Sequence, residues 1–379
     1  MRYLIIASYP PSILKFRGAL IQALQDKGFE IHIAAPDFSS YPEEAKALKE
    51  MGYIVYEIPM QRTGANPLND AKTLSALYLL MKKIQPSHVM GYTIKPVIYG
   101  SLAAKVARVP HRFALITGLG YAFQGADEQD YKKSNLQKIV RKLYSVALAS
   151  THKVFFQNPD DEALFKSMGI LKPSAATKVV NGSGVDVSEY IVQPFPTIDN
   201  VLSPKFLLIA RLLGDKGVRE YAQTARIVKK KYPQAQFDLV GWIDDNPDAI
   251  EQQELDNWIN EGLFNFWGKL DDVKPAIAAS SIYVLPSYRE GTPRTVLEAM
   301  AMGRPIITTN APGCRETVID GYNGYLVPVK AVEELAAAME RFIINPELII
   351  EMGKASRQLV EEKFDVHAVN RTMLNEMGL

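Results

Sequence analysis

The fold of this chain is decided by residues 283–305, which read YVLPSYREGTPRTVLEAMAMGRP. The stretch opens with a short apolar run, residues 283–286, which predicts a buried parallel strand. A polar loop follows, and a helix is then expected to begin with Thr292 as its N-cap and Pro293 at its first position. Gly303 is expected to end that helix. Strand, loop and helix in this order predict one unit of a parallel α/β sheet.

The predicted helix is apolar over most of its surface, with Arg294 and Glu298 as a narrow polar stripe. A carboxylate on such a helix is costly to bury without a partner. One interpretation is a Glu298–Arg294 ion pair at the helix surface. The other is that the loop and the helix start face a ligand. Free N–H groups at a helix N-terminus attract anions, and a nearby carboxylate accepts hydrogen bonds from the hydroxyls of a ribose.

Length and composition indicate a soluble globular class. The chain has 379 residues, which favours two domains, and its 47% hydrophobic and 22% charged residues are ordinary. The single cysteine, Cys314, excludes an intramolecular disulfide or a multi-cysteine zinc site and fits a reducing compartment. No signal-peptide pattern is visible, and no apolar run approaches the roughly 18 residues of a membrane span.

Strands and helices alternate along both halves of the chain. This alternation predicts an α/β protein with two doubly wound parallel-sheet domains, each with a ligand-binding edge outside the carboxyl ends of its strands. The proline-containing stretch 190–204 is the predicted linker, which gives domains at 1–190 and 191–363. The stretch 331–379 is predicted to be helical, with a break near 345–346. The predicted strands are residues 3–8, 30–36, 53–59, 88–92, 112–117, 153–157, 178–180, 206–210, 237–240, 264–267, 282–286, 305–309 and 325–327.

Two cations follow the first predicted strand of the second half. Arg211 lies at the end of that strand, and Lys216 comes just before a predicted helix. Two cations beside a helix N-terminus suit a phosphate group, since arginine makes bidentate contacts and lysine acts as a point charge. Trp242 follows the next strand and either lines a base pocket or packs as a loop aromatic.

The loop regions of the first half offer weaker candidates. Phe16 and Arg17 follow the first strand, where no G-x-G-x-x-G dinucleotide fingerprint is present. Arg17 would place a guanidinium at the ligand-binding edge, or the loop is an ordinary connection. Gly118 and Gly120 follow another strand and either let the backbone approach a ligand or form a tight turn.

Charge is divided unequally along the chain. Residues 1–195 contain 23 Lys and Arg against 16 Asp and Glu, and residues 196–379 contain 20 against 26. The segment 131–153 contains Lys132, Lys133, Lys138, Arg141, Lys142 and Lys153, with apolar residues at helical spacing and no acidic residue. Such a segment either lies on an anionic membrane or packs as a helix with a solvated basic face. A nucleic-acid groove is disfavoured because surface aromatics are not interleaved with the cations.

The stretch EGTPRTVLEAMAMGRPII, with Glu290 and Glu298 separated by seven residues and with Arg211 and Lys216 upstream, resembles the E-x7-E signature of retaining glycosyltransferases of the GT-B fold, family 4 type. The resemblance extends over nearly the whole chain. It implies two Rossmann-like domains that face a cleft, an acceptor-binding domain first and a nucleotide-sugar domain second. It also implies that residues 364–379 pack back onto the first domain.

The resemblance also implies roles for individual residues. Glu290, Arg211 and Lys216 would act in catalysis, with the two cations neutralising the diphosphate and Glu290 orienting the sugar. Glu298 would hold the ribose hydroxyls. The remaining donor-binding positions are Gly291, Thr292, Trp242, Leu270 and Val273, and the acceptor-side positions are Phe16, Arg17, Gly118 and Gly120. Many family members have a histidine where this chain has Thr117. No metal ion and no cofactor are implied.

Phe16–Arg17 and the stretches 112–115, 118–120 and 287–291 carry a closer resemblance, to bacterial transferases that act on undecaprenyl-diphosphate-linked sugars. This resemblance implies transfer of a hexose or N-acetylhexosamine from a nucleotide-sugar, most readily a UDP-sugar, to a lipid-linked saccharide. It places the protein in the cytoplasm, peripheral on the inner face of the plasma membrane, without nucleic acid as a partner. The alternatives are a nucleotide-sugar epimerase on the same fold and a non-catalytic sugar-binding scaffold subunit.

Overall fold

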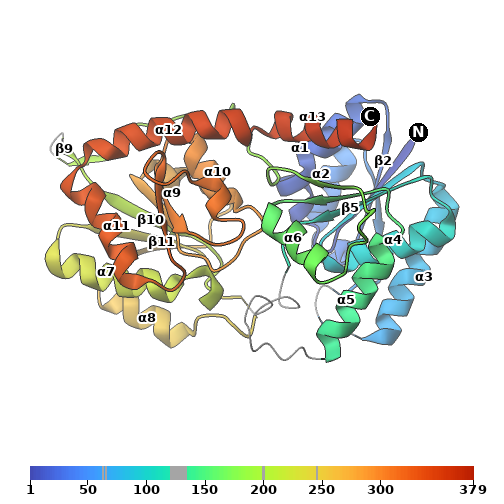
Figure 1. The fold of residues 1–379 in the computed structure, drawn as a ribbon, viewed down its shortest axis with the longest axis horizontal. Helices are drawn as coiled ribbons and strands as arrows, with labels where there is room; N and C mark the ends of the chain where they lie inside the picture. The colour runs from blue at the N-terminus through green and yellow to red at the C-terminus, as the bar shows by residue number, and fades with distance from the viewer. Residues whose placement is uncertain (62–63, 65, 120–134, 199–200, 245) are drawn as a thin grey trace. The chain divides into compact units, whose positions relative to one another are not determined.

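The computed structural model describes the chain except for residues 62–63, 65, 120–134, 199–200 and 245. The chain forms two compact units (Figure 1). Unit 1 consists of Met1–Ser183 and His367–Leu379, and unit 2 of Gly184–Val366. The division falls ahead of residue 190, where the linker was expected to begin. Two backbone hydrogen bonds join the start of unit 2 to its end. Val185 N donates to Phe364 O (3.0 Å), and Val366 N donates to Val185 O (3.0 Å).

Unit 1 is built on a seven-stranded parallel sheet of order β3-β2-β1-β4-β5-β6-β7. Its inner strands are buried on both faces and therefore consist mostly of apolar residues, whereas the edge strands β3 and β7 are only partly buried. The elements are β1 (Arg2–Ile6), α1 (Ser12–Asp26), β2 (Glu30–Ala35), η1 (Phe38–Ser40), α2 (Pro42–Glu50), β3 (Ile54–Glu57), α3 (Pro67–Ile84), β4 (His88–Tyr92), α4 (Ile94–Ala107), β5 (His111–Ile116), α5 (Asn135–Leu148), β6 (Lys153–Phe156), α6 (Pro159–Ser167) and β7 (Thr177–Val179).

The last helix of the chain, α13 (Val366–Met377), packs on unit 1. Met373, Leu374 and Met377 are buried in the same core cluster as the β1 residues Tyr3 and Ile5. At the rim of this contact, Glu376 accepts hydrogen bonds from Lys153 and Lys178. Apolar packing and ion pairs thus join the C-terminal helix to the N-terminal part of unit 1.

Unit 2 has a six-stranded parallel sheet of order β12-β11-β10-β13-β14-β15. Two short strands, β8 and β9, pair in antiparallel fashion in the stretch that was expected to be a plain linker. The elements are β8 (Thr197–Ile198), β9 (Val201–Leu202), β10 (Lys205–Ile209), η3 (Gly214–Lys216), α7 (Val218–Lys231), β11 (Gln236–Val240), α8 (Gln252–Asn260), β12 (Asn265–Gly268), α9 (Lys274–Ala278), β13 (Ile282–Leu285), α10 (Arg294–Ala301), β14 (Ile306–Thr309), η4 (Arg315–Thr317), β15 (Gly324–Val327), α11 (Val332–Ile344) and α12 (Glu347–Lys363). The prediction of two parallel-sheet α/β domains is confirmed.

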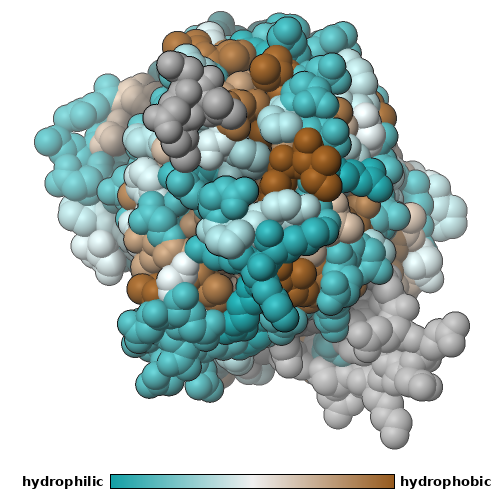
Figure 2. Space-filling view, turned by 90° about the vertical axis from the view of Figure 1, so that its left-hand side faces the viewer, coloured by the Kyte–Doolittle hydropathy of each residue, from teal (hydrophilic) through white to brown (hydrophobic). Residues whose placement is uncertain are grey.

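The face of unit 2 seen in Figure 2 is a mixed surface. Hydrophobic residues lie there in separate patches among hydrophilic ones. Exposed apolar side chains of unit 2 include Ile344 at the end of α11 and Ile350 in α12. Isolated apolar residues of this kind are normal on a globular surface.

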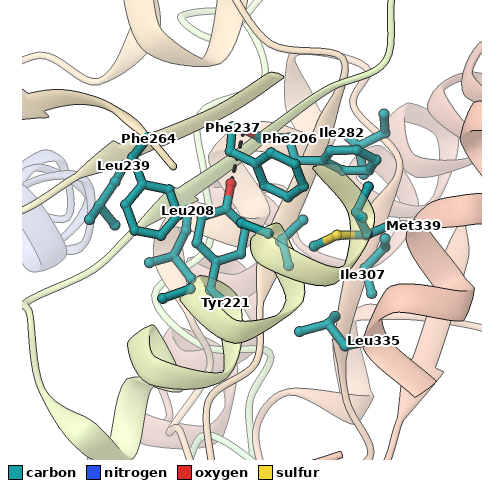
Figure 3. Close-up of a cluster of buried hydrophobic side chains, with 14 of the residues drawn as sticks. Phe206, Leu208, Tyr221, Phe237, Leu239, Phe264, Ile282, Ile307, Leu335 and Met339 are labelled. Atoms are coloured by element: carbon teal, nitrogen blue, oxygen red, sulfur yellow. Dashed lines mark hydrogen bonds between the residues drawn. The ribbon is translucent and has the colours of Figure 1, made fainter. Parts of the chain in front are cut away.

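The core of unit 2 includes aromatic and aliphatic side chains from the sheet, from α7 and from α11 (Figure 3). Tyr221 stacks on Phe264 with ring centroids 5.3 Å apart. Its hydroxyl donates to Phe206 O (3.0 Å) or Asp238 O (3.1 Å), so the buried polar group is satisfied. This bond ties α7 to β10 and β11, the strands that precede two loops of the candidate site.

Arg304, just after α10, is fully buried. Its guanidinium donates to Gln193 O (2.8 Å), Pro194 O (2.9 Å) and Ala278 O (3.1 Å), and lies 4.7 Å from the ring centroid of Phe195. Burial lowers the pKa of Arg304 to about 10, so the side chain remains a cation at neutral pH. Arg304 therefore fixes residues 193–195, which lead into the sheet of unit 2, against α9.

Candidate active site

In unit 2, the loops that carry the charged candidate residues leave the sheet at one place. β10 pairs with β11 on one side and with β13 on the other, so the strand order reverses between β10 and β13. In doubly wound sheets, ligands bind at such a switch point, outside the carboxyl ends of the strands. The loop after β10 carries Arg211 and Lys216, and the loop after β13 carries Glu290. The sheet topology thus brings these side chains to one edge.

Two glycines allow the loops to approach closely. Gly217, between η3 and α7, has φ +71°, and a Cβ there would lie 2.2 Å from Pro286 O. Gly313 has φ +80°, and a Cβ there would lie 2.1 Å from Glu290 O. Any other residue would meet backbone at these positions, in addition to the strain of a left-handed conformation. The glycines therefore hold the β10 and β14 loops against the β13 loop.

Lys216 and Glu290 form an ion pair at the junction of the two loops. Lys216 Nζ lies 2.7 Å from Glu290 Oε1, and the two side chains are 14% and 19% exposed. Ser287 Oγ donates to the same carboxylate oxygen (2.9 Å). Although burial alone favours the neutral amine, the nearby carboxylates of Glu290 and Asp215 raise the pKa of Lys216 above its ordinary value. The site therefore holds a fixed positive charge at neutral pH.

Arg211 is the second cation of the site. Its Nη1 lies 2.8 Å from Asp244 Oδ2, and the two side chains are 36% and 24% exposed. Sequence reasoning missed Asp244, which lies two residues after Trp242 in the same loop. A pair this exposed contributes little to stability, so an anionic ligand can compete with Asp244 for the guanidinium.

Glu298 is 2% exposed, and a carboxylate this buried is stable only if hydrogen-bond donors or cations compensate for its lost hydration. Its Oε1 accepts from Arg294 Nε (2.8 Å) and from Tyr190 OH (3.0 Å). The predicted Glu298–Arg294 pair is present, with the Arg294 side chain 20% exposed and that of Glu298 3% exposed. Tyr190 lies 108 residues earlier in the chain, and no local pattern pointed to it.

The predicted cap of α10 is wrong. The helix begins at Arg294, and Pro293 rather than Thr292 is the N-cap, with ψ 110° and no side-chain cap hydrogen bond. Pro293 lies outside the helix because its backbone is extended, while its carbonyl accepts from Val296 N (3.1 Å) and Leu297 N (3.3 Å). The predicted C-terminus is confirmed. Gly303 has φ +78°, and its N–H donates to Met300 O (2.9 Å).

The candidate donor-binding positions differ in what they can offer a ligand. Trp242 is 41% exposed, with Lys269 Nζ 5.3 Å from its ring centroid, so the indole is an accessible loop aromatic rather than a packed one. Leu270 is half-buried, whereas Val273 is buried in the core of unit 2. The predicted donor-binding role of Val273 stays a prediction, with 8% of the residue exposed. Gly291 is buried and Thr292 half-buried, both between β13 and α10.

The acceptor-side candidates lie in unit 1. The strand order there reverses between β1 and β4. Arg17 is 4% exposed, and its guanidinium lies 5.5 Å from the ring centroid of Tyr92, the last residue of β4. Phe16 is 36% exposed, and Gly118 has φ +145°. Gly120 lies outside the described residues.

The basic segment is only partly a free surface. Lys138 and Lys142 are exposed on α5, whereas Arg141 is 8% exposed and Lys153 is paired with Glu376. Lys132 and Lys133 lie outside the described residues. The interpretation of 131–153 as one basic face is therefore corrected, since burial and ion pairing remove Arg141 and Lys153 from it.

Cys314 is buried beside this site. Burial, followed by the charge of Glu290, raises the pKa of its thiol to about 12, so it is not a nucleophile at neutral pH. Within the described ranges, no group of three or more His, Cys, Asp or Glu side chains is arranged to hold a metal ion.

Two family models match the two units in turn. Residues 12–158 match the glycosyl transferase 4-like family, and residues 203–345 match the glycosyl transferases group 1 family. The chain is 27% identical to an N,N'-diacetylbacillosaminyl-diphospho-undecaprenol alpha-1,3-N-acetylgalactosaminyltransferase of Campylobacter jejuni, over 94% of this chain and 93% of the relative. It is 25% identical to a UDP-Gal:alpha-D-GlcNAc-diphosphoundecaprenol alpha-1,3-galactosyltransferase of Escherichia coli, over 79% and 77%.

A solved structure has the same fold. The crystal structure of HepE from Anabaena in complex with UDP superposes with a TM-score of 0.77 at 18% sequence identity, and each chain is covered over 100% of its length. The two family matches and this architecture agree with the resemblance found in the sequence. The chain belongs to the group 1, family 4-like glycosyltransferases of the GT-B fold, and it is a glycosyltransferase.

Proposed function

We propose that the protein is a retaining hexosyltransferase that moves a hexose or N-acetylhexosamine from a UDP-sugar to a saccharide linked to undecaprenyl diphosphate. Such a reaction builds bacterial surface glycans or glycoprotein glycans. The observation that carries the proposal is the placement of Arg211, Lys216 and Glu290 on loops of unit 2 at one sheet edge, with Glu298 on α10, the helix that follows the Glu290 loop. The acceptor class rests on the relatives from Campylobacter jejuni and Escherichia coli, whose names specify sugars on undecaprenyl diphosphate.

In the proposed reaction, the two cations stabilise charge that develops on the leaving diphosphate. Fixed cations in a partly dehydrated site stabilise such charge without reorganisation during the reaction. Glu290 fixes Lys216 through the 2.7 Å ion pair and orients the sugar. Glu298 accepts hydrogen bonds from the ribose, in the way acidic residues do in dinucleotide folds. The cation pair takes the place of a metal ion, and no cofactor takes part.

Nucleotide binding tests the donor site. UDP is expected to bind more tightly than GDP or ADP, and Glu298→Ala and Arg211→Ala are each expected to weaken UDP binding about tenfold or more, because each removes a charged hydrogen-bond partner. Calorimetry with the three nucleotides measures this. Arg226→Ala and Glu261→Ala are matched controls, since this pair lies elsewhere in unit 2, with 43% of each side chain exposed.

Two results would contradict the proposal. If no nucleotide binds, or if both site variants bind UDP like wild type, the assignment of the donor site is wrong. The alternative of a non-catalytic scaffold subunit is then favoured. Release of UDP and free sugar without a lipid acceptor would favour the epimerase. Transfer of sugar to a polyprenyl-diphosphate acceptor would support the transferase.

Unit 1 has a surface that suits the membrane in which such an acceptor resides. Helices α3, α4 and α5 cover one face of its sheet, and Asp70, their only acidic residue, is paired with Lys95 (2.8 Å). Among the described residues, no helix is long and apolar enough to cross a membrane. The exposed side chains of the three helices include Lys72, Lys82, Lys83, Lys105, Lys138 and Lys142, with the apolar Leu79, Val106, Ile139 and Val146.

We therefore propose peripheral contact with the anionic inner face of the plasma membrane through α3, α4 and α5. Each lysine near an anionic surface contributes about 1 kcal/mol to binding. The double variant Lys138→Glu and Lys142→Glu is expected to bind anionic liposomes at least tenfold more weakly. The same two changes at Lys229 and Lys231 of α7 are the control. Equal sedimentation of wild type with anionic and neutral liposomes would remove the membrane proposal.

A further inference from the structure

The carboxylate of Glu298 is held from two sides. Arg294 donates to its Oε1 from the same helix, and the hydroxyl of Tyr190 donates to the same oxygen from the segment that opens unit 2. The terminal torsion of a glutamate is broad, so a single contact leaves the carboxylate free to rotate. Two donors on one oxygen restrict this rotation, and both of these hydrogen bonds use Oε1 rather than Oε2. Burial, followed by the Glu298 charge, raises the pKa of Tyr190, which keeps its hydroxyl a donor.

Tyr190 is itself rigidly placed. Its carbonyl accepts from Arg357 Nη1 (2.7 Å), and the same guanidinium donates to Val187 O (3.0 Å) and Ala301 O (2.6 Å). Lys274 Nζ lies 4.9 Å from the Tyr190 ring centroid, and the residue is 8% exposed. Arg357 of α12 thus fixes the backbone of Tyr190, while the side chain of Tyr190 contacts α9 and α10.

We propose that Tyr190 is a positioning residue for recognition of the donor's ribose, an inference that rests on the proposed nucleotide site. By holding Oε1 of Glu298, Tyr190 presents Oε2 to the two ribose hydroxyls. The tyrosine does not touch the ligand and acts through the carboxylate. It gives the site its preference for a nucleotide with intact ribose hydroxyls over a deoxygenated one.

The test compares UDP with 2′,3′-dideoxy-UDP by calorimetry. Wild type is expected to prefer UDP about tenfold or more, the effect of losing a hydrogen bond to a charged group. Tyr190→Phe is expected to bind UDP about tenfold more weakly and dideoxy-UDP like wild type, so the preference disappears. Tyr322→Phe is the matched control, because this exposed tyrosine of unit 2 bonds Gln358 (3.3 Å) instead.

A double-mutant cycle with Glu298→Gln separates positioning from general stability. If Tyr190 acts through Glu298, the double variant should show no further loss of ribose preference beyond either single variant. A preference retained in Tyr190→Phe, or an equal loss of affinity for both nucleotides, overturns the inference and leaves the donor site intact. If wild type binds neither nucleotide, the proposed function fails and the inference fails with it.

Discussion

Replacing Lys216 by methionine is expected to lower the rate of sugar transfer by about 10²–10³-fold, the usual cost of losing one preorganised charge that stabilises a leaving oxyanion. Lys216 is 14% exposed and paired with Glu290, so its ammonium is dehydrated and already placed. Methionine retains much of the apolar stem and removes the charge. Initial rates at saturating UDP-sugar measure the effect, with and without EDTA, because a cation-assisted reaction needs no metal ion.

The variant also leaves the Glu290 carboxylate without its ammonium partner, which by itself destabilises unit 2. Lys216→Met combined with Glu290→Gln removes both charges, so its unfolding temperature shows how much stability the unpaired carboxylate costs in the single variant. The double variant should unfold nearer the wild-type temperature and remain inactive. Lys231→Met controls for loss of a paired lysine, because Lys231 binds Glu340 (2.9 Å) on the surface. Transfer within threefold of wild type in Lys216→Met would show that this ammonium does not stabilise the leaving group.

The architecture was predictable because parallel strands covered on both faces have a composition of their own. Residues 282–285 are all buried and form an unbroken hydrophobic run, so the composition of the stretch predicts the strand without tertiary information. The sequence did not predict the order of the strands, and it is the observed pairing of β10 with β13 that places Arg211 and Glu290 on neighbouring loops. The (i, i+4) pair of Arg294 with Glu298 is likewise local geometry.

The partners of these residues were not predictable in the same way. Asp244 meets Arg211 across 33 residues, and Tyr190 meets Glu298 across 108. Such pairs depend on how loops and helices pack, and nothing near either residue in the sequence marks them. The α10 cap was missed for a related reason. Thr292 and Pro293 both suit a helix start, and only the extended backbone of Pro293 decides between them.

Acidification from pH 7.5 to pH 5 is expected to cost unit 1 about 2 kcal/mol of folding free energy through His88. His88 is 4% exposed, and its ring stacks on His111 with centroids 4.3 Å apart. Burial, with smaller contributions from the charges of His111 and the Met1 amino group, lowers the pKa of His88 from 6.5 to about 4. Between these values the unfolded chain binds the proton more readily. The stability is therefore complete above pH 6.5 and is lost as the pH falls toward 4.

Urea unfolding at the two pH values measures this, with His88→Phe as the informative variant, because phenylalanine keeps the stacking on His111 and Tyr3 but cannot titrate. The chosen window excludes carboxylates with a lowered pKa such as Glu376, whose contribution is lost only below their usual range. His152 lies inside the window, since burial and then the charges of Arg112 and His111 lower its pKa. His152→Gln should therefore remove a separate part of the pH dependence. An unchanged slope in His88→Phe would assign the acid sensitivity of unit 1 to His152 and to other groups.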